Sequence, residues 1–172
     1  MMTLISGGAA SGKSEYAEEI AVAHGGSLVY LATMQVWGEE DLRRVERHRA
    51  MRAGKGFLTV EQPYDLVGVS VPAGSVVLLE CLSNLTANEC FGSNGFERAK
   101  ERILEGIDRL ITQSAHLVIV TNELFGDGVT YPEETSRYLE VLSSLNCELA
   151  RRADRVIEVV CGLPVIWKGE HA

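Results

Sequence analysis

A glycine-rich octapeptide near the N-terminus carries the clearest chemical signal in the sequence. It follows a short apolar run and precedes an amphipathic helical pattern, which is the context in which such loops bind phosphate. Glycines let the chain curl with its amide hydrogens inward, and the following helix N-terminus adds positive potential. We therefore expect a purine nucleoside triphosphate here, with Lys13 on the β- and γ-phosphates and Ser14 on Mg²⁺. The residues that match GxxxxGK[ST] are Gly7, Gly8, Ala9, Ala10, Ser11, Gly12, Lys13 and Ser14.

A loop of this type also predicts an acidic residue at the end of another strand, where it holds the metal directly or through water. Glu80 closes the apolar run 75–80 and fits that role. The sequence has no NKxD motif of the kind that reads guanine in switch-type GTPases. The loop alone therefore does not choose the base.

A second candidate site is a locally basic segment in an otherwise acidic chain. Six of the sixteen cations fall within thirteen residues, namely Arg43, Arg44, Arg47, Arg49, Arg52 and Lys55. Three acids precede them, which suits the macrodipole of a helix over residues 39–53. Arg44, His48 and Arg52 recur at four-residue intervals, so they share one face of that helix.

Two interpretations of His48 stay open at this point. Neighbouring cations disfavour protonation of the ring, and a neutral imidazole could attack an α-phosphorus and carry a nucleotidyl group as a phosphoramidate. The alternative is a solvated basic helix with an incidental histidine, and spacing alone favours it.

The elements that must position these residues alternate along the chain. Short apolar runs at residues 3–6, 28–32, 57–60, 76–81, 117–121, 155–160 and 165–168 predict strands, and helical patterns occupy 13–24, 39–53, 95–114 and 133–153. Such alternation predicts an α/β fold of the P-loop NTPase type, with a doubly wound, mostly parallel sheet. The last two strands, separated by residues 162–164, should pair antiparallel at one edge.

Composition limits the remaining possibilities. A chain of 172 residues predicts one domain over 1–172, and no apolar run is long enough to cross a bilayer, so we expect a cytoplasmic protein. The net charge of -8 argues against binding nucleic acid. The four cysteines have no CxxC spacing and indicate neither a zinc site nor disulfides.

Taken together, these segments resemble the bifunctional adenosylcobinamide kinase/adenosylcobinamide-phosphate guanylyltransferase family of cobalamin biosynthesis. The resemblance covers nearly the whole chain. The blocks that carry it are the loop 7–14, Tyr30-Leu31-Ala32-Thr33, Arg44-Val45 with His48-Arg49 and Arg52, Thr59-Val60-Glu61, Leu78-Leu79-Glu80-Cys81-Leu82 with Asn88, Val120-Thr121-Asn122-Glu123, and 154–168.

The resemblance implies two reactions on one scaffold. ATP or GTP phosphorylates the aminopropanol hydroxyl of adenosylcobinamide, and GMP then passes from GTP to that phosphate, giving adenosyl-GDP-cobinamide and pyrophosphate. It implies that His48 is the guanylylated residue and that Lys13 is also catalytic, with Mg²⁺ as cofactor, a corrinoid substrate and a homotrimer. Besides the loop, the nucleotide-binding positions it implies are Ala32, Thr33, Met34, Arg49, Ala50, Met51, Arg52, Glu61 and Glu80.

This sequence departs from the family pattern at a few positions. Ala10 stands where an arginine is usual, the stretch 124–132 contains an extra residue and an acid, and Cys147 replaces a glutamine. Two rival functions remain: a P-loop small-molecule or nucleotide kinase in which His48 is idle, and a non-catalytic nucleotide-dependent switch. An adduct of His48 with α-labelled GTP would separate the first rival from the bifunctional enzyme.

Overall fold

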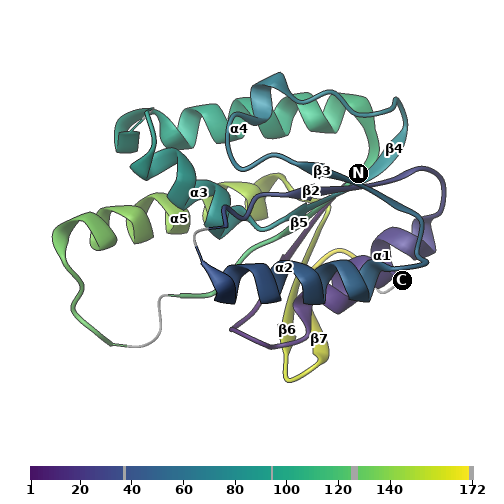
Figure 1. Ribbon diagram of the computed structural model, residues 1–172, viewed down its shortest axis with the longest axis horizontal. Coiled ribbons are helices and arrows are strands. Elements are labelled where there is room, and N and C mark those ends of the chain that lie inside the picture. The colour runs from purple at the N-terminus through teal and green to yellow at the C-terminus, as the bar shows by residue number, and fades with distance from the viewer. Residues whose placement is uncertain (37, 94, 125–127, 171–172) are drawn as a thin grey trace.

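A seven-stranded sheet organises the chain in the computed structural model, which describes residues 1–36, 38–93, 95–124 and 128–170 (Figure 1). The strand order is β3-β2-β4-β5-β1-β6-β7, and every pairing is parallel except β6 with β7. The predicted α/β fold with an antiparallel edge strand is therefore confirmed. The strands are β1 (Met2–Ser6), β2 (Leu28–Ala32), β3 (Phe57–Glu61), β4 (Ser75–Glu80), β5 (Ser114–Val120), β6 (Arg155–Val160) and β7 (Leu163–Lys168).

Helices cover both faces of this sheet, which explains why the central strands are apolar at most of their positions. One buried cluster joins inward residues of β1, β2, β4 and β5 to α3 (Leu82–Phe91), α4 (Gly95–Gln113) and α5 (Glu133–Arg152). The alternate residues of the same strands pack against α1 (Lys13–His24). Figure 1 shows α3, α4 and α5 on one side of the sheet and α1 with α2 (Glu39–Arg52) on the other.

Helix α2 differs from the others because none of its described side chains belongs to a buried apolar cluster. Its attachment to the sheet must therefore come from polar side chains. This is the helix that carries the basic segment and His48.

Two elements escaped prediction, and one turn was placed wrongly. Residues 82–91 form α3 and Leu66–Gly68 form a 3-10 turn, η1, in segments where we expected no helix. The turn between β6 and β7 consists of Cys161 and Gly162, both with positive φ, so Leu163 and Pro164 belong to β7 instead. Within the described part of the chain, no helix is long and apolar enough to span a membrane.

Candidate nucleotide and phosphoryl-transfer site

Two glycines of the phosphate loop, Gly7 and Gly12, pack too closely against neighbouring groups to be replaced by larger residues. A Cβ atom on Gly7 would come within 2.6 Å of the Val159 carbonyl oxygen, and one on Gly12 would lie 3.3 Å from the Cα of Gly162. The amide of Gly162 donates to the Ser11 carbonyl over 2.8 Å, so the β6–β7 turn supports the loop. Lys13 is 8% exposed, and its Nζ donates to the Gly8 carbonyl over 2.8 Å, placing its ammonium inside the loop.

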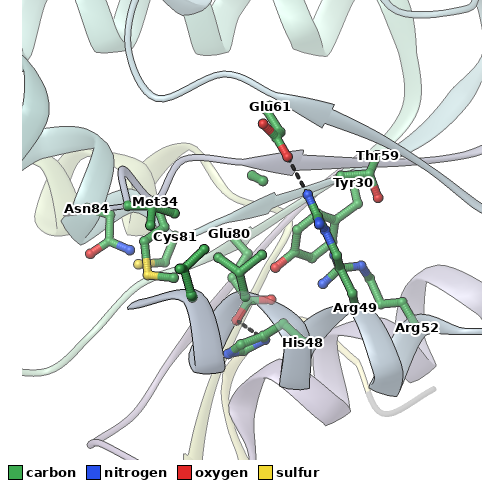
Figure 2. A pocket seen from close by; sticks show the side chains of 14 residues that line it. Tyr30, Met34, His48, Arg49, Arg52, Thr59, Glu61, Glu80, Cys81 and Asn84 are labelled. Carbon is green, nitrogen blue, oxygen red and sulfur yellow. Dashed lines mark hydrogen bonds and ion pairs between the residues drawn. The ribbon is translucent and has the colours of Figure 1, made fainter. Parts of the chain in front are cut away.

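The carboxylate of Glu80 links the loop to helix α2. Parallel strands end at the same edge of a sheet, so the last residue of β4 lies beside the loop that follows β1. Ser14 Oγ donates to Glu80 Oε1, and the same oxygen lies 3.7 Å from His48 Nδ1 (Figure 2). The side chains of His48 and Glu80 are 19% and 9% exposed, so both are largely withdrawn from water.

A cavity of about 300 Å³ opens between α2 and the carboxyl ends of β2, β3 and β4. Its lining includes the apolar residues Val36, Leu42 and Val45. It also includes His48, Arg49 and Arg52, which Figure 2 labels. A lining that combines apolar and cationic side chains suits a nucleotide, whose base is planar and whose phosphates are anionic. The remaining lining residues are Tyr30, Ala32, Met34, Thr59, Glu61, Glu80, Cys81 and Asn84.

Arg52 is a buried cation in the lining of this cavity. Its guanidinium carbon lies 3.4 Å from the centre of the Tyr30 ring, and the residue is only 7% exposed. Its buried Nε and Nη1 atoms have no hydrogen-bond acceptor among the described residues. Burial, reinforced by the nearby Glu80 carboxylate, raises the pKa of Tyr30 well above its ordinary value, so this phenol stays protonated. The arrangement leaves charged donors available for an anionic ligand.

Ion pairs fasten the C-terminal half of α2 to the sheet and to α1. Arg49 Nη2 lies 2.6 Å from Glu61 Oε1, an exposed pair worth little in stability by itself. Lys55, just after the helix, lies 2.7 Å from Oε2 of Glu18, whose side chain is fully buried in α1. Because α1 begins at the phosphate loop, the second pair ties the position of α2 to the helix that the loop starts.

Hydrogen bonds between side chains and the backbone hold the segment after β2 in place. Thr33 Oγ1 donates to the Cys81 carbonyl over 2.8 Å and accepts from the Cys81 amide over 2.7 Å. Asn88 Nδ2 donates to the Thr33 carbonyl over 2.8 Å. Thr33 is therefore buried and shapes the wall of the cavity from behind.

The structure brings together most, but not all, of the predicted site residues. Ala32, Met34, His48, Arg49, Arg52, Glu61 and Glu80 line the cavity. Ala50 and Met51 do not line it, because α2 presents only every third or fourth residue to the sheet. Thr33 and the loop residues 7–14 do not line it either, but Ser14 of the loop donates a hydrogen bond to Glu80, which does. The side chain of Arg44 and residues 125–127 of the altered loop lie outside the described part of the chain.

Sequence reasoning missed several residues that line the cavity. Tyr30 and Thr59 lie in predicted strands, which indicates a structural role, and Asn84 lies in a segment where no helix was expected. The alternative interpretation, a solvated basic helix, does not hold for the face that bears Arg52, because this residue is buried against Tyr30. The only feature of the sequence that pointed to this face of the helix was the four-residue spacing of His48 and Arg52.

Curated proteins of similar sequence match along nearly their full length. The chain is 34% identical to the bifunctional adenosylcobalamin biosynthesis protein CobP of Pseudomonas aeruginosa, covering 99% of both chains. It is 32% identical to the bifunctional adenosylcobalamin biosynthesis protein CobU of Escherichia coli K12, covering 96% of this chain and 98% of that one.

Solved structures with low sequence identity share the fold. A KaiC-like protein from Pyrococcus horikoshii OT3 superposes with a TM-score of 0.51 at 14% identity, covering 99% of this chain and 80% of that one. The RadB recombinase superposes with the same TM-score of 0.51, also at 14% identity, over 91% of this chain and 73% of its own. These likenesses speak for the P-loop NTPase-type architecture alone.

A family model assigns the chain directly. The model described as cobinamide kinase / cobinamide phosphate guanyltransferase matches residues 3–166, which include the loop, α2 and every strand end that forms the cavity. Together with the full-length relatives, this match shows that the chain belongs to the cobinamide kinase/cobinamide phosphate guanyltransferase family.

Proposed function

We propose that this chain phosphorylates adenosylcobinamide with ATP or GTP and then transfers GMP from GTP to the new phosphate through His48. Membership of a family described as both kinase and guanyltransferase supports the two-step enzyme over a plain kinase or a switch. One structural observation supports the assignment of residues: a single Glu80 oxygen accepts from Ser14 of the phosphate loop and lies 3.7 Å from His48 Nδ1. The two candidate reaction centres therefore meet at one carboxylate.

In the kinase step, the loop and Lys13 bind the β- and γ-phosphates of the donor. The acceptor's hydroxyl oxygen attacks the γ-phosphorus, the bond to the β-phosphate oxygen breaks, and the nucleoside diphosphate leaves. The hydroxyl proton passes to water or to a nearby carboxylate. Arg49 and Arg52 lie in the cavity where they can neutralise phosphate charge during transfer.

In the transferase step, the ring of His48 acts as the nucleophile. Nδ1 faces Glu80, so Nε2 is the nitrogen that attacks the α-phosphorus of GTP. A P–N bond forms as the bond to the β-phosphate oxygen breaks, and pyrophosphate leaves. A phosphate oxygen of cobinamide phosphate then attacks the same phosphorus, the P–N bond breaks, and the neutral ring is restored. Glu80 stabilises the positive charge of the ring while it carries GMP.

The oxygen ligands beside the loop fit Mg²⁺. Ser14 and Glu80 offer a hydroxyl and a carboxylate, which are donors that this ion prefers, and nucleotide phosphates usually complete its shell. Among the described residues, no three His, Cys, Asp or Glu side chains gather into a self-sufficient metal cluster. When bound, the ion would neutralise charge on the β- and γ-phosphates.

We also propose a homotrimer that works in the cytoplasm, where both nucleotides are supplied, and that binds no nucleic acid. Edge strand β7 exposes a row of apolar side chains that a second subunit could cover, with Leu163 at 70%, Val165 at 40% and Trp167 at 69% exposure. The net charge of -8 opposes binding to a phosphate backbone. Light scattering measures the oligomer directly.

Labelling with α-labelled GTP tests the role of His48. In the absence of corrinoid, the wild-type protein should acquire one acid-labile, base-stable GMP adduct, as a phosphoramidate does. His48→Ala should acquire none, whereas His24→Ala, an exposed control, should label as well as wild type. Label retained by His48→Ala would show that another residue carries the nucleotide.

A further inference from the structure

A second cavity, of about 550 Å³, lies beside the first along helix α3. Asn84 of α3 lines the first cavity, and Asn88, four residues further along the helix, lines the second. Four residues correspond to about 6 Å along a helix axis, so the two cavities are neighbours. The segment after β2 separates them, with Met34 lining the first and Gln35 the second.

The chemistry of the second cavity differs from that of the first. Among the described residues that line it, none is Lys or Arg, so it is unsuited to phosphates. It presents two aromatic rings, Tyr64 at 54% and Phe91 at 56% exposure. Gln35 adds an amide group, and Asn88 adds an amide oxygen, because its Nδ2 already donates to two backbone carbonyls. Glu89 also lines the cavity, but it is only 2% exposed. A wall of exposed rings and neutral amides suits a large, flat, amide-bearing ligand.

Buried polar groups hold the Tyr64 wall rigid. Glu89 is 2% exposed, and its Oε1 accepts the Asp65 amide over 2.6 Å. Gln62 Nε2 donates to the Tyr64 carbonyl over 2.6 Å. These contacts fix the backbone that presents the exposed ring, and a preformed wall loses less entropy when a ligand binds.

Phe91 and the remaining wall are fixed in a similar way. The Phe91 ring meets Phe96 edge to face at 5.2 Å, although much of it stays exposed. Asn88 Nδ2 donates to the carbonyls of Thr33 and Pro63, over 2.8 and 2.7 Å, and so joins the segments on both sides of the cavity.

We propose that this second cavity binds the corrin macrocycle of the acceptor, while the arm that bears its hydroxyl or phosphate extends into the first cavity. This inference rests on the proposed function, because it takes a cobinamide as the acceptor. The corrin is a broad, flat ring fringed with amides, which matches the exposed rings and amide groups of the wall. Both steps can then use one corrinoid position, since only the end of the arm changes from a hydroxyl to a phosphate.

Substitution of the exposed rings tests the proposal with little risk to folding. Tyr64→Ser and Phe91→Ser should each raise the KM for adenosylcobinamide in the kinase step by about tenfold. The KM for GTP and the labelling of His48 without acceptor should stay unchanged. Leu58→Ser is the matched control, because Leu58 is 57% exposed and lines neither cavity, so its corrinoid KM should equal that of wild type.

Three outcomes overturn the inference. A corrinoid KM within twofold of wild type in the Tyr64→Ser, Phe91→Ser double variant would show that the macrocycle binds elsewhere. A raised KM for GTP instead would assign the cavity to nucleotide. An equal rise in the corrinoid KM of Leu58→Ser would show that the effect is not specific to the second cavity. If His48 of the wild-type protein acquired no GMP label, the transferase role would be refuted. The corrinoid KM of the kinase step would still test the second cavity separately.

Discussion

Glu80→Gln changes one charge at the point where the phosphate loop meets His48. Glutamine keeps the shape and still accepts the Ser14 hydroxyl, so the effect isolates the negative charge. Two unit charges 3.7 Å apart interact by about 4 to 5 kcal/mol at an effective dielectric constant of about 20. The histidine ring gains only part of its positive charge in the transition state, so the Glu80 charge should stabilise that state by about 2 kcal/mol. That corresponds to about a thirtyfold loss in the rate of adduct formation.

Rapid-quench measurement of adduct formation, at saturating GTP and Mg²⁺ and without corrinoid, gives this rate directly. Glu97→Gln is the control, because it removes an exposed carboxylate that pairs with Arg137 and lines neither cavity. We expect it to change the rate by less than about threefold. If Glu80 acted only by holding the metal, a higher Mg²⁺ concentration would restore the rate of Glu80→Gln, and the account predicts that it does not. A rate within about threefold of wild type would refute the reasoning.

Three further predictions follow from single contacts. Arg52→Lys should raise the KM for GTP by about tenfold, because Arg52 lines the cavity and an ammonium lacks the forked donors of a guanidinium. Steady-state kinetics would check this, with Arg43→Lys, an exposed position, as the control. Gly106→Ala should lower the free energy of unfolding by about 1–3 kcal/mol, because the new Cβ atom would lie 2.3 Å from the Cβ atom of Leu66. Urea titration measures this change, and Gly38→Ala is the control because a Cβ atom there would have no neighbour within 4 Å. Burial, reinforced by His24, lowers the pKa of His116 to about 4. The unfolded chain therefore binds the extra proton between about pH 6.5 and 4, and stability should fall as pH falls through that window; thermal melts of His116→Gln should lack this component.

The phosphate loop and its acid could be predicted from sequence because both are set by local rules. A strand, a glycine-rich turn and a helix follow one another without interruption at residues 2–24, and Glu80 ends an apolar strand at the edge where parallel strands meet. Helix α3 escaped because its buried face mixes apolar residues with Ser83, Thr86 and Glu89, which obscures the helical period. Packing of Leu82 and Leu85 against α4 and α5 stabilises this helix although its sequence pattern does not predict it.

The second half of the site depends on contacts that sequence spacing cannot reveal. Glu18 and Lys55 are 37 positions apart, and nothing local predicts that a buried carboxylate anchors the end of α2. Spacing also favoured a solvated basic helix, yet Arg52 is buried because the Tyr30 ring lies beneath it. Only the arrangement of β2, β4 and α2 places His48 beside Glu80.

Product analysis of His48→Ala tests the two-step account most directly. Wild-type protein supplied with adenosylcobinamide and GTP should form adenosyl-GDP-cobinamide and pyrophosphate. The variant should stop at adenosylcobinamide phosphate, because its phosphate loop is intact and its nucleotide carrier is gone. Formation of the GDP-linked product by His48→Ala at the wild-type rate would contradict the account.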